Sequence, residues 1–307
     1  MTKHLTADER RGALYGLLSV LFFTANVLCL RGIALYAPAV DGWVGTFMRG
    51  LVGFLFLYLW YRNGRGLEMG KLFTHPALII RGVIGAITIV ILYITITKLG
   101  AGRAIILNLT YPLFGAILAA LFMKEPLTLR HLACLIAGLA GLTLFLAPTM
   151  THTAINYYDL LALVGAFLAA IVVMLIRHLR HTSHPSTIYA SQCVWGVFIA
   201  APLSAAKAPE IPATAWLALS GIALLVAGGQ LLITHCFRHL SVAKGSGIQM
   251  LLPPFTAAGG MLFFGETYSL LEASGAIITL LATWFLVSAP VSSKNNANSF
   301  HPQKANS

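Results

Sequence analysis

Charged residues are scarce in this chain, and acidic residues are the scarcest of them. Of its 307 residues 9% are charged, and only nine are Asp or Glu, whereas about a quarter of the residues in a soluble domain are charged. Hydrophobic residues make up 58%, and the mean hydropathy is +0.83. A chain of this composition cannot cover a core with a solvated surface. It excludes an ordinary soluble fold and predicts an integral membrane protein.

Sequence signals for catalysis and metal binding are also missing. No Asp or Glu lies in the interior of a long apolar stretch, and neither His-Glu-x-x-His nor Gly-x-Ser-x-Gly occurs. We therefore predict no enzymatic activity, no cofactor and no metal, and keep an intramembrane enzyme as an alternative. The four cysteines lack the spacing of a metal site and are interpreted as packing residues; they are Cys29, Cys134, Cys193 and Cys236. The loop histidines His178, His181 and His184 lack acidic partners and are interpreted as part of a solvated turn.

Ten apolar stretches are long enough to cross a membrane, which takes about 20 residues in a helix. They cover residues 12–33, 42–61, 77–97, 103–123, 131–148, 158–177, 186–205, 214–236, 242–264 and 270–289. Almost every residue falls in one of them or in a short connection. The predicted fold class is therefore an all-α integral membrane protein with ten transmembrane helices.

The net charge of +11 is distributed as expected for a membrane protein. With the N-terminus inside, fourteen of the 20 Lys and Arg residues fall in cytoplasmic segments. Three fall outside, namely Lys98, Arg103 and Lys207, and three lie within spans, namely Arg31, Arg49 and Arg81. This asymmetry follows the positive-inside rule and predicts that both termini are cytoplasmic. It argues against nucleic acid as a partner and favours a multi-pass protein of a bacterial inner membrane.

Two of the stretches repeat a pattern. One contains Asn-Leu-Thr-Tyr-Pro-Leu-Phe from Asn108, and the other contains Gln-Met-Leu-Leu-Pro-Pro-Phe from Gln249. The same offset of 141 residues pairs Pro112 with Pro253 and Glu125 with Glu266. Interrupted helices at matching positions of two halves point to a membrane transporter and its substrate site. The predicted halves are residues 1–150 and 151–290, followed by a disordered cytoplasmic tail, residues 291–307.

Each half has five spans, so the second half starts on the opposite side of the membrane from the first. Two similar units with opposite insertion are related by a pseudo-two-fold axis in the membrane plane. We therefore predict two inverted five-helix repeats around a central cavity. Such a pair has two nearly equivalent packings, one open to each side, which is the geometric basis of alternating access.

The whole pattern, over residues 11–289, resembles the drug/metabolite transporter superfamily and its EamA-type permeases. The resemblance rests on an arginine in the second span, a proline and a closing glutamate in spans four and nine, and a glycine-rich fifth span. In this chain the arginine is Arg49, and the prolines and glutamates are Pro112, Glu125, Pro253 and Glu266. The tandem Pro253-Pro254 departs from the single proline of that pattern. The resemblance implies export or facilitated movement of small organic metabolites.

The proline breaks are candidate substrate sites. A proline leaves the carbonyl four residues earlier without its helical partner, and here those residues are Asn108 and Gln249. Irregular backbone at mid-membrane depth is tolerated where it lines a wet cavity or is buried in protein. We favour cavity lining because the arrangement occurs twice. The alternative is a structural kink whose backbone groups are satisfied by Thr110 or Thr256.

An arginine within a span is costly. Arg49 lies seven residues into the second span, about 10 Å below the outer surface. Two interpretations stay open: it snorkels to the headgroups, or it faces the cavity and pairs with Glu266 across an outer gate. Arg31 and Arg81 lie nearer to span ends, where snorkelling is the favoured interpretation.

Other polar or aromatic groups within spans each need a partner and could serve only as interhelical hydrogen-bonding groups. Together, the amides could converge on a cavity suited to a neutral or zwitterionic solute, with the two tyrosines stacking on it. The predicted substrate-binding residues are Asn26, Arg49, Tyr93, Asn108, Tyr111, Gln230 and Gln249. The predicted hinge and gate residues are Pro112, Pro253, Pro254, Glu125 and Glu266.

The sequence thus predicts a secondary transporter for a small organic metabolite, amino acid-like or another polar solute. Because no acid lies inside a span, facilitated diffusion or exchange is favoured over proton coupling. A non-transporting membrane scaffold is a further alternative. The predicted partners are the solute and the bilayer, and the protein is a monomer or homodimer. Small residues recur at four-residue spacing in several spans, for example in the run that includes Gly141 and in the run that includes Gly275. We interpret them as packing positions within the chain.

Overall fold

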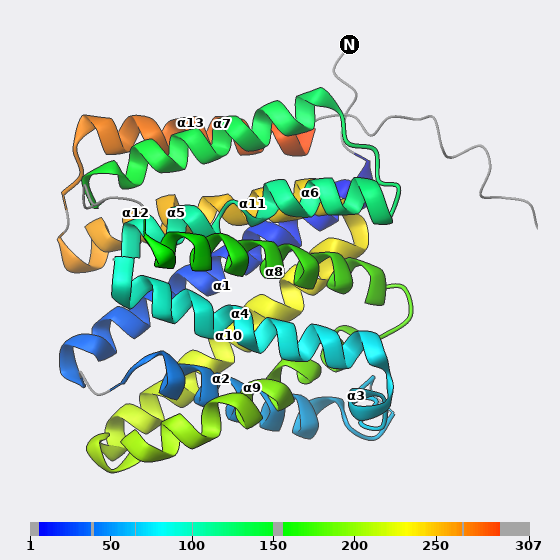
Figure 1. Ribbon diagram of the computed structural model, residues 1–307, viewed down its shortest axis with the longest axis vertical. Helices are drawn as coiled ribbons and strands as arrows, with labels where there is room; N and C mark the ends of the chain where they lie inside the picture. The colour runs from blue at the N-terminus through cyan, green and yellow to red at the C-terminus, as the bar shows by residue number, and fades with distance from the viewer. Residues whose placement is uncertain are drawn as a thin grey trace, which may run out of the picture.

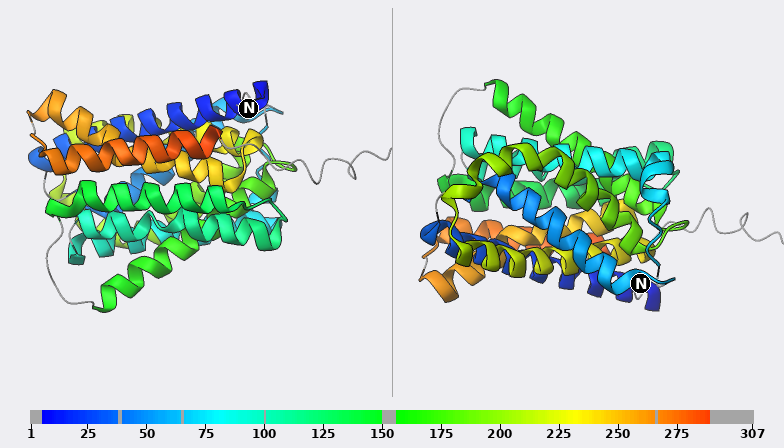
Figure 2. Two further views of the ribbon diagram at one scale, coloured as in Figure 1. Left: turned by 90° about the horizontal axis from the view of Figure 1, so that it is seen from above. Right: turned by 90° about the horizontal axis from the view of Figure 1, so that it is seen from below.

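The computed structural model describes residues 6–37, 40–64, 66–99, 101–149, 156–265 and 267–288. Within these ranges the chain is helical and forms no β-strand. Figure 1 shows the long helices packed side by side, and Figure 2 shows from two further sides that they run across the same dimension of the molecule. The predicted tail, residues 291–307, lies outside the described residues.

Ten helical segments are long and apolar enough to span a membrane, as the ten apolar stretches predicted. They are α1 (Ala7–Tyr36), α2 (Gly42–Tyr61), α4 (Pro76–Leu99), α5 with α6 (Ala101–Asn108 and Tyr111–Phe122), α7 (Leu129–Leu146), α8 (Tyr157–Leu179), α9 (Pro185–Lys207), α10 (Ala213–His239), α11 with α12 (Val242–Ile248 and Leu252–Phe264) and α13 (Leu270–Ser288). The short helix α3 (Lys71–Thr74) and three 3₁₀ turns complete the described elements; the turns are Ala147–Thr149, Ala208–Glu210 and Gln249–Leu251. The all-α, ten-span fold class is confirmed.

Acidic and hydroxyl side chains define where several spans begin. Asp41 caps α2 by accepting hydrogen bonds from two backbone N–H groups of its first turn. Thr6 with Glu9 at α1, and Asn156 with Asp159 at α8, form reciprocal capping boxes. A negative charge is also favourable at a helix N-terminus, where backbone N–H groups are unpaired. The few acids of the chain are therefore used mainly at span ends.

The helices pack in pairs that are far apart in sequence. Extensive contacts join α1 to α10, α2 to α9, α4 to α8 and α7 to α13. In Figure 1, α7 and α13 form one edge of the molecule, and α2 and α9 lie at the opposite edge.

These pairs match the arrangement that a five-helix repeat requires. Under that repeat, the α1–α10 pair corresponds to α8–α4, α2–α10 corresponds to α9–α4, and α1–α12 corresponds to α8–α6. The pairs α2–α9 and α7–α13 each correspond to themselves. This packing is compatible with the predicted halves, and their inverted relation and boundaries remain a prediction.

Small residues bring α7 and α13 close together. The Thr279 hydroxyl donates to the Gly138 carbonyl across this pair at 3.3 Å. A Cβ atom at Gly275 would overlap the backbone of Gly141 and Phe145. The four-residue spacing of small residues in these spans therefore serves packing within the chain.

Both predicted breaks are present, but the helices end and restart rather than bend. In span four α5 ends at Asn108, and Pro112 lies in the first turn of α6. In span nine a 3₁₀ turn, Gln249–Leu251, precedes α12, which has Pro253 and Pro254 in its first turn. Proline is well tolerated there because the first N–H groups of a helix have no partner within it. The Thr110 hydroxyl donates to the Leu107 carbonyl at 2.7 Å, and not to the Asn108 carbonyl that Pro112 leaves without its helical partner.

Candidate functional site

A cavity lies among four spans, and among the described residues that line it one arginine is the only strongly basic one. We call it the Arg49 cavity. It is lined by Asn26 and Leu30 of α1, Gly45, Met48 and Arg49 of α2, Tyr93 of α4, and Leu219, Ile222, Ala223 and Val226 of α10. The space open to the centre of a water molecule is about 40 Å³. This is enough for ordered water but too little for an organic metabolite, so the helices must separate to admit one.

Glycines on α2 make room for the aromatic ring that closes the cavity. A Cβ atom at Gly42 would overlap the ring of Tyr93, and one at Gly45 would lie 3.6 Å from its hydroxyl oxygen. Tyr93 therefore packs directly on the α2 backbone. In this position the Tyr93 side chain lines the same cavity as Asn26 and Arg49.

A second, narrower space adjoins Arg49 on the side of α9, and we call it the Tyr189 crevice. It is lined by Thr46, Arg49 and Gly50 of α2, Ala86 and Ile89 of α4, and Tyr189, Gln192, Cys193 and Gly196 of α9. Its volume for water centres is about 10 Å³. Arg49 is shared by both spaces and thus links α1 and α10 on one side to α9 on the other.

Arg81 of α4 approaches the same region and does not snorkel. Its side chain is 0% exposed, and none of its three guanidinium nitrogens has a hydrogen-bond partner among the described residues. Its electrostatic neighbours are Cys193, Arg49 and Tyr189. The snorkelling prediction for Arg81 is therefore wrong. Packing between α4 and α9 encloses the side chain before it can reach the headgroup region.

The bundle is tied at the end where α1 begins, which we call the N-terminal end. Glu125, in the loop after α6, pairs with Arg177 of α8 at 3.0 Å and accepts a hydrogen bond from the Val242 N–H of α11 at 2.9 Å. Arg177 also donates to the Phe237 carbonyl of α10. Lys244 of α11 pairs with Glu9 of α1 at 2.8 Å. These bonds connect helices from both predicted halves.

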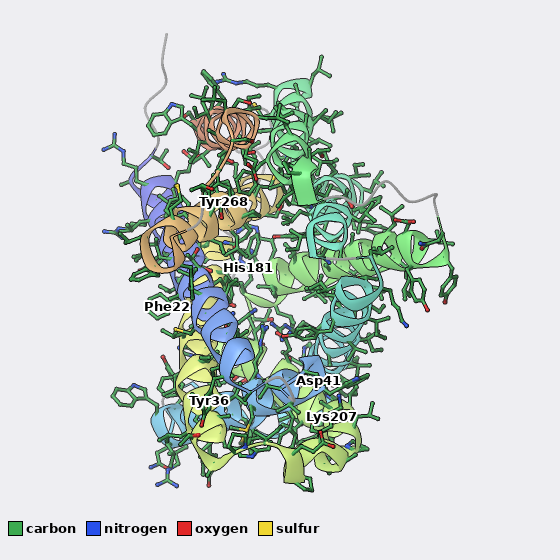
Figure 3. The ribbon with its side chains drawn as sticks, turned by 90° about the vertical axis from the view of Figure 1, so that its left-hand side faces the viewer. Phe22, Tyr36, Asp41, His181, Lys207 and Tyr268 are labelled. Carbon is green, nitrogen blue, oxygen red and sulfur yellow. The ribbon has the colours of Figure 1, made fainter. Side chains whose placement is uncertain are left out.

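The opposite end has a tie of its own. Lys207, the last residue of α9, forms an ion pair with Asp41, the cap of α2. The Tyr36 hydroxyl of α1 also hydrogen-bonds to the Thr214 hydroxyl of α10. Figure 3, viewed from this side, shows Asp41 and Lys207 on neighbouring elements. Both spaces thus lie along α2, between the tied ends.

Comparison with known families places the chain. The EamA-like transporter family matches it twice, over residues 10–147 and 156–288. The chain belongs to the EamA-like transporter family. Family membership makes it a multi-pass membrane transporter rather than an enzyme, as the sequence predicted.

Individual relatives are more distant. The chain is 25% identical over 275 residues to a pseudopaline exporter of Pseudomonas aeruginosa, with 89% of this chain and 94% of the relative covered. The counterpart from a second strain of that species is 25% identical over 285 residues. One solved crystal structure shares the fold, with a TM-score of 0.74 at 14% identity, over 90% of this chain and 96% of the other.

For this EamA-like protein, the structure brings together three of the seven predicted substrate-binding residues. Asn26, Arg49 and Tyr93 line one cavity. The other four line neither of the two cavities described above. They are Asn108, Tyr111, Gln230 and Gln249.

The surroundings of two of these four differ from the cavity. Tyr111 packs with a core cluster that includes Leu142 and Phe145. Gln249 is buried in a turn that contacts α1, α7 and α13, and its amide nitrogen has no hydrogen-bond partner among the described residues. An outer pair between Arg49 and Glu266 is not testable, because Glu266 lies outside the described residues.

The sequence did not single out Arg81 or Tyr189 as site residues. Both lie within six residues of a span end, where polar side chains usually reach the interface. Their burial arises from the contact of α9 with both α2 and α4, which no local pattern reveals. One signal was available: glycines Gly50, Gly53 and Gly82 face α9 on these two helices.

Proposed function

We propose that this protein is a secondary transporter that exports a small organic metabolite by alternating access through the Arg49 cavity. The observation that carries the proposal is the position of that cavity. It lies between α1, α2 and α4 of the first predicted half and α10 of the second. Rocking of one half against the other would open a space at this boundary to either side.

The ties at the two ends support alternation. Glu125 and Arg177 hold the N-terminal end, and Asp41 and Lys207 hold the opposite end. Each pair joins helices of different halves, so movement of the halves at one end must break the tie there. We assign the Glu125 tie to an inner gate and the Asp41 tie to an outer gate, with Pro112, Pro253 and Pro254 at the hinges.

Direction and location follow from two separate supports. The pseudopaline exporters from Pseudomonas aeruginosa, which cover nearly the whole chain, favour export. The excess of Lys and Arg in the segments next to the N-terminal end favours cytoplasmic termini in a bacterial inner membrane. Facilitated diffusion or exchange agrees with the lack of Asp and Glu in the span interiors.

The first experiment identifies the solute and measures its movement. Metabolite profiling of cells that overexpress the protein should show a solute depleted inside and enriched outside. Purified protein in proteoliposomes should then move that solute down its gradient. No flux of any enriched solute would contradict the proposal and favour a scaffold.

A variant connects the flux to the cavity. Arg49→Gln should reduce flux about tenfold or more, because a charge-assisted hydrogen bond contributes roughly 1.5–3 kcal/mol. Arg62→Gln is the matched control, since Arg62 follows the other end of α2 and is exposed. Equal flux in both variants would exclude the Arg49 cavity as the passage.

A further inference from the structure

We propose that Arg49 and Arg81 together form an anion site, and that the transported solute binds there through a carboxylate or phosphate group. This inference rests on the proposed function and deepens it by naming the chemical class of the substrate. The amide side chains alone led us to expect a neutral or zwitterionic solute. The proposed site requires a solute that bears at least one negatively charged group.

The first support is the isolation of Arg81. Its guanidinium is fully buried, and all three nitrogens are without a hydrogen-bond partner among the described residues. A guanidinium has five N–H donors and no acceptor. Leaving such a group both desolvated and unpaired is strongly unfavourable. A site that is completed only when a ligand binds explains why the residue is placed there.

The second support is a neighbouring positive charge. Arg49 and Arg81 are within electrostatic reach of each other and of the Tyr189 hydroxyl and the Cys193 thiol. Tyr189 and Cys193 line the crevice that Arg49 also lines. Two like charges that interact electrostatically repel each other, and both attract an anion. The Tyr189 hydroxyl adds a neutral donor next to them.

The third support is that the described residues provide no counter-charge for Arg81. No carboxylate is among the electrostatic neighbours of Arg81. The acids that the structure describes nearest to these helices have partners elsewhere: Asp41 pairs with Lys207, and Glu68 pairs with Lys71. By contrast, the interhelical ion pair of Glu125 with Arg177 has both of its members within the chain. Among the described residues no carboxylate neutralises Arg81, and in this proposal the solute supplies the anion.

The depth of the two residues fits a path across the membrane. Arg49 lies seven residues from the start of α2, and Arg81 lies five residues from the start of the antiparallel α4. At 1.5 Å per residue, these offsets are about 10 Å and 8 Å from opposite ends of the bundle. Both guanidinium groups therefore lie within the bundle rather than at either of its ends. Guanidinium groups bind carboxylate and phosphate oxygens in a two-pronged geometry.

The test begins without any ligand. The melting temperature of the purified full-length protein in detergent should be unchanged or higher in Arg81→Met, because the variant removes an unpaired buried charge with little loss of volume. Arg177→Met should lower the melting temperature, because this variant leaves the Glu125 carboxylate without its ion-pair partner. A decrease in Arg81→Met as large as that in Arg177→Met would show that Arg81 makes structural bonds, and would overturn the proposal.

The second arm adds defined probes at about 10 mM, namely succinate, inorganic phosphate, and the neutral succinamide, each against KCl of equal ionic strength. Succinate or phosphate should raise the wild-type melting temperature by about 2–4 °C, and succinamide should not. Arg49→Met and Arg81→Met should abolish the rise, whereas the exposed-residue control Arg62→Met should keep it. Failure of both anions with the wild type, or an equal rise in Arg81→Met, would overturn the site.

The source of the anion is resolved by adding phosphatidylglycerol to the micelles. Stabilisation by this lipid alone, with dependence on Arg81, would assign the site to a lipid headgroup and overturn the substrate assignment. Because all of these measurements report binding in micelles, they are separate from transport. Flux without anion binding would refute this inference and leave the proposed function intact.

Discussion

At the scale of single residues, the acids and the arginines of this protein occupy different places. Glu9, Asp41 and Asp159 lie at span ends, where they cap helices or pair with lysine. Arg49 and Arg81 lie inside the bundle, where no described acid neutralises Arg81. The end charges fix the ends of helices, whereas we propose that the interior charges bind the solute.

Glu125 offers a test of the tie at the N-terminal end. Glu125→Gln keeps the shape but removes the charge that pairs with Arg177 and caps α11. Because both side chains are largely buried, the variant should lose about 1–3 kcal/mol of stability, measured as a fall in melting temperature of several degrees. Glu68→Gln is the control, since the Glu68–Lys71 pair is 44–45% exposed and should contribute less than about 1 kcal/mol. Equal effects would mean that the Glu125 tie is not structural.

His184 gives a pH-dependent prediction in the loop before α9. Its Nδ1 accepts a hydrogen bond from the Ser186 N–H at 3.3 Å, which caps the helix and needs a neutral ring nitrogen. Burial, and then the neighbouring Arg180, lower the pKa of His184. The unfolded chain therefore binds this proton more readily, and stability should fall as the pH drops below about 6.5.

The measurement is the melting temperature between about pH 7.5 and 5.5. His184→Asn should flatten the decrease, because asparagine caps a helix without titrating. His178→Asn, a change at an exposed histidine nearby, should keep the wild-type slope. A His184→Asn slope identical to that of the wild type would refute the role of this cap.

Residue-level prediction from the sequence named polar side chains within spans but not which of them lie together. Asn26, Arg49 and Tyr93 were identified singly, and they share a cavity. It was wrong for Arg81, because distance along one helix does not report which other helices cover it. Whether Asn108 and Gln249 contact the solute stays a prediction, since the structure sets their breaks apart from the cavity described.

At the scale of elements, the broken spans and the glycine-lined helix pairs follow from sequence pattern. The two breaks fall at the residues that the repeat indicated, because proline cannot continue a helix from a preceding turn. The pattern could not show the backbone conformation at each break. Each span restarts as a new helix with proline in its first turn, so the unpaired N–H position is used and no kinked helix is needed.

The α7–α13 pair provides a prediction at this scale. Gly275→Ala should destabilise the protein by about 1–3 kcal/mol or more, because the added methyl group would overlap the α7 backbone at Gly141 and Phe145. Gly221→Ala is the matched control on α10, where a Cβ atom meets nothing within 4 Å. Melting temperatures in detergent compare the two. A Gly275→Ala variant as stable as Gly221→Ala would show that the pair is looser than described.

At the scale of the whole molecule, the fold was predictable because composition alone requires membrane spans. The hydropathy of the sequence predicts the number and lengths of the spans, and the positions of the prolines predict the two breaks. The cavity was not predictable, since it forms where α2 meets α1, α4, α9 and α10. Those contacts depend on how two distant halves of the chain dock.

The central claim is that the Arg49 cavity opens in turn to each side of the membrane. The direct measurement is labelling of Tyr93→Cys by an impermeant maleimide, in a protein whose four native cysteines are replaced. Leu57→Cys, at a buried position on α2 outside both cavities, serves as the unreactive control. If the cavity alternates, Tyr93→Cys is labelled when the reagent is added from either side alone. Labelling from one side only, or from neither, would contradict it.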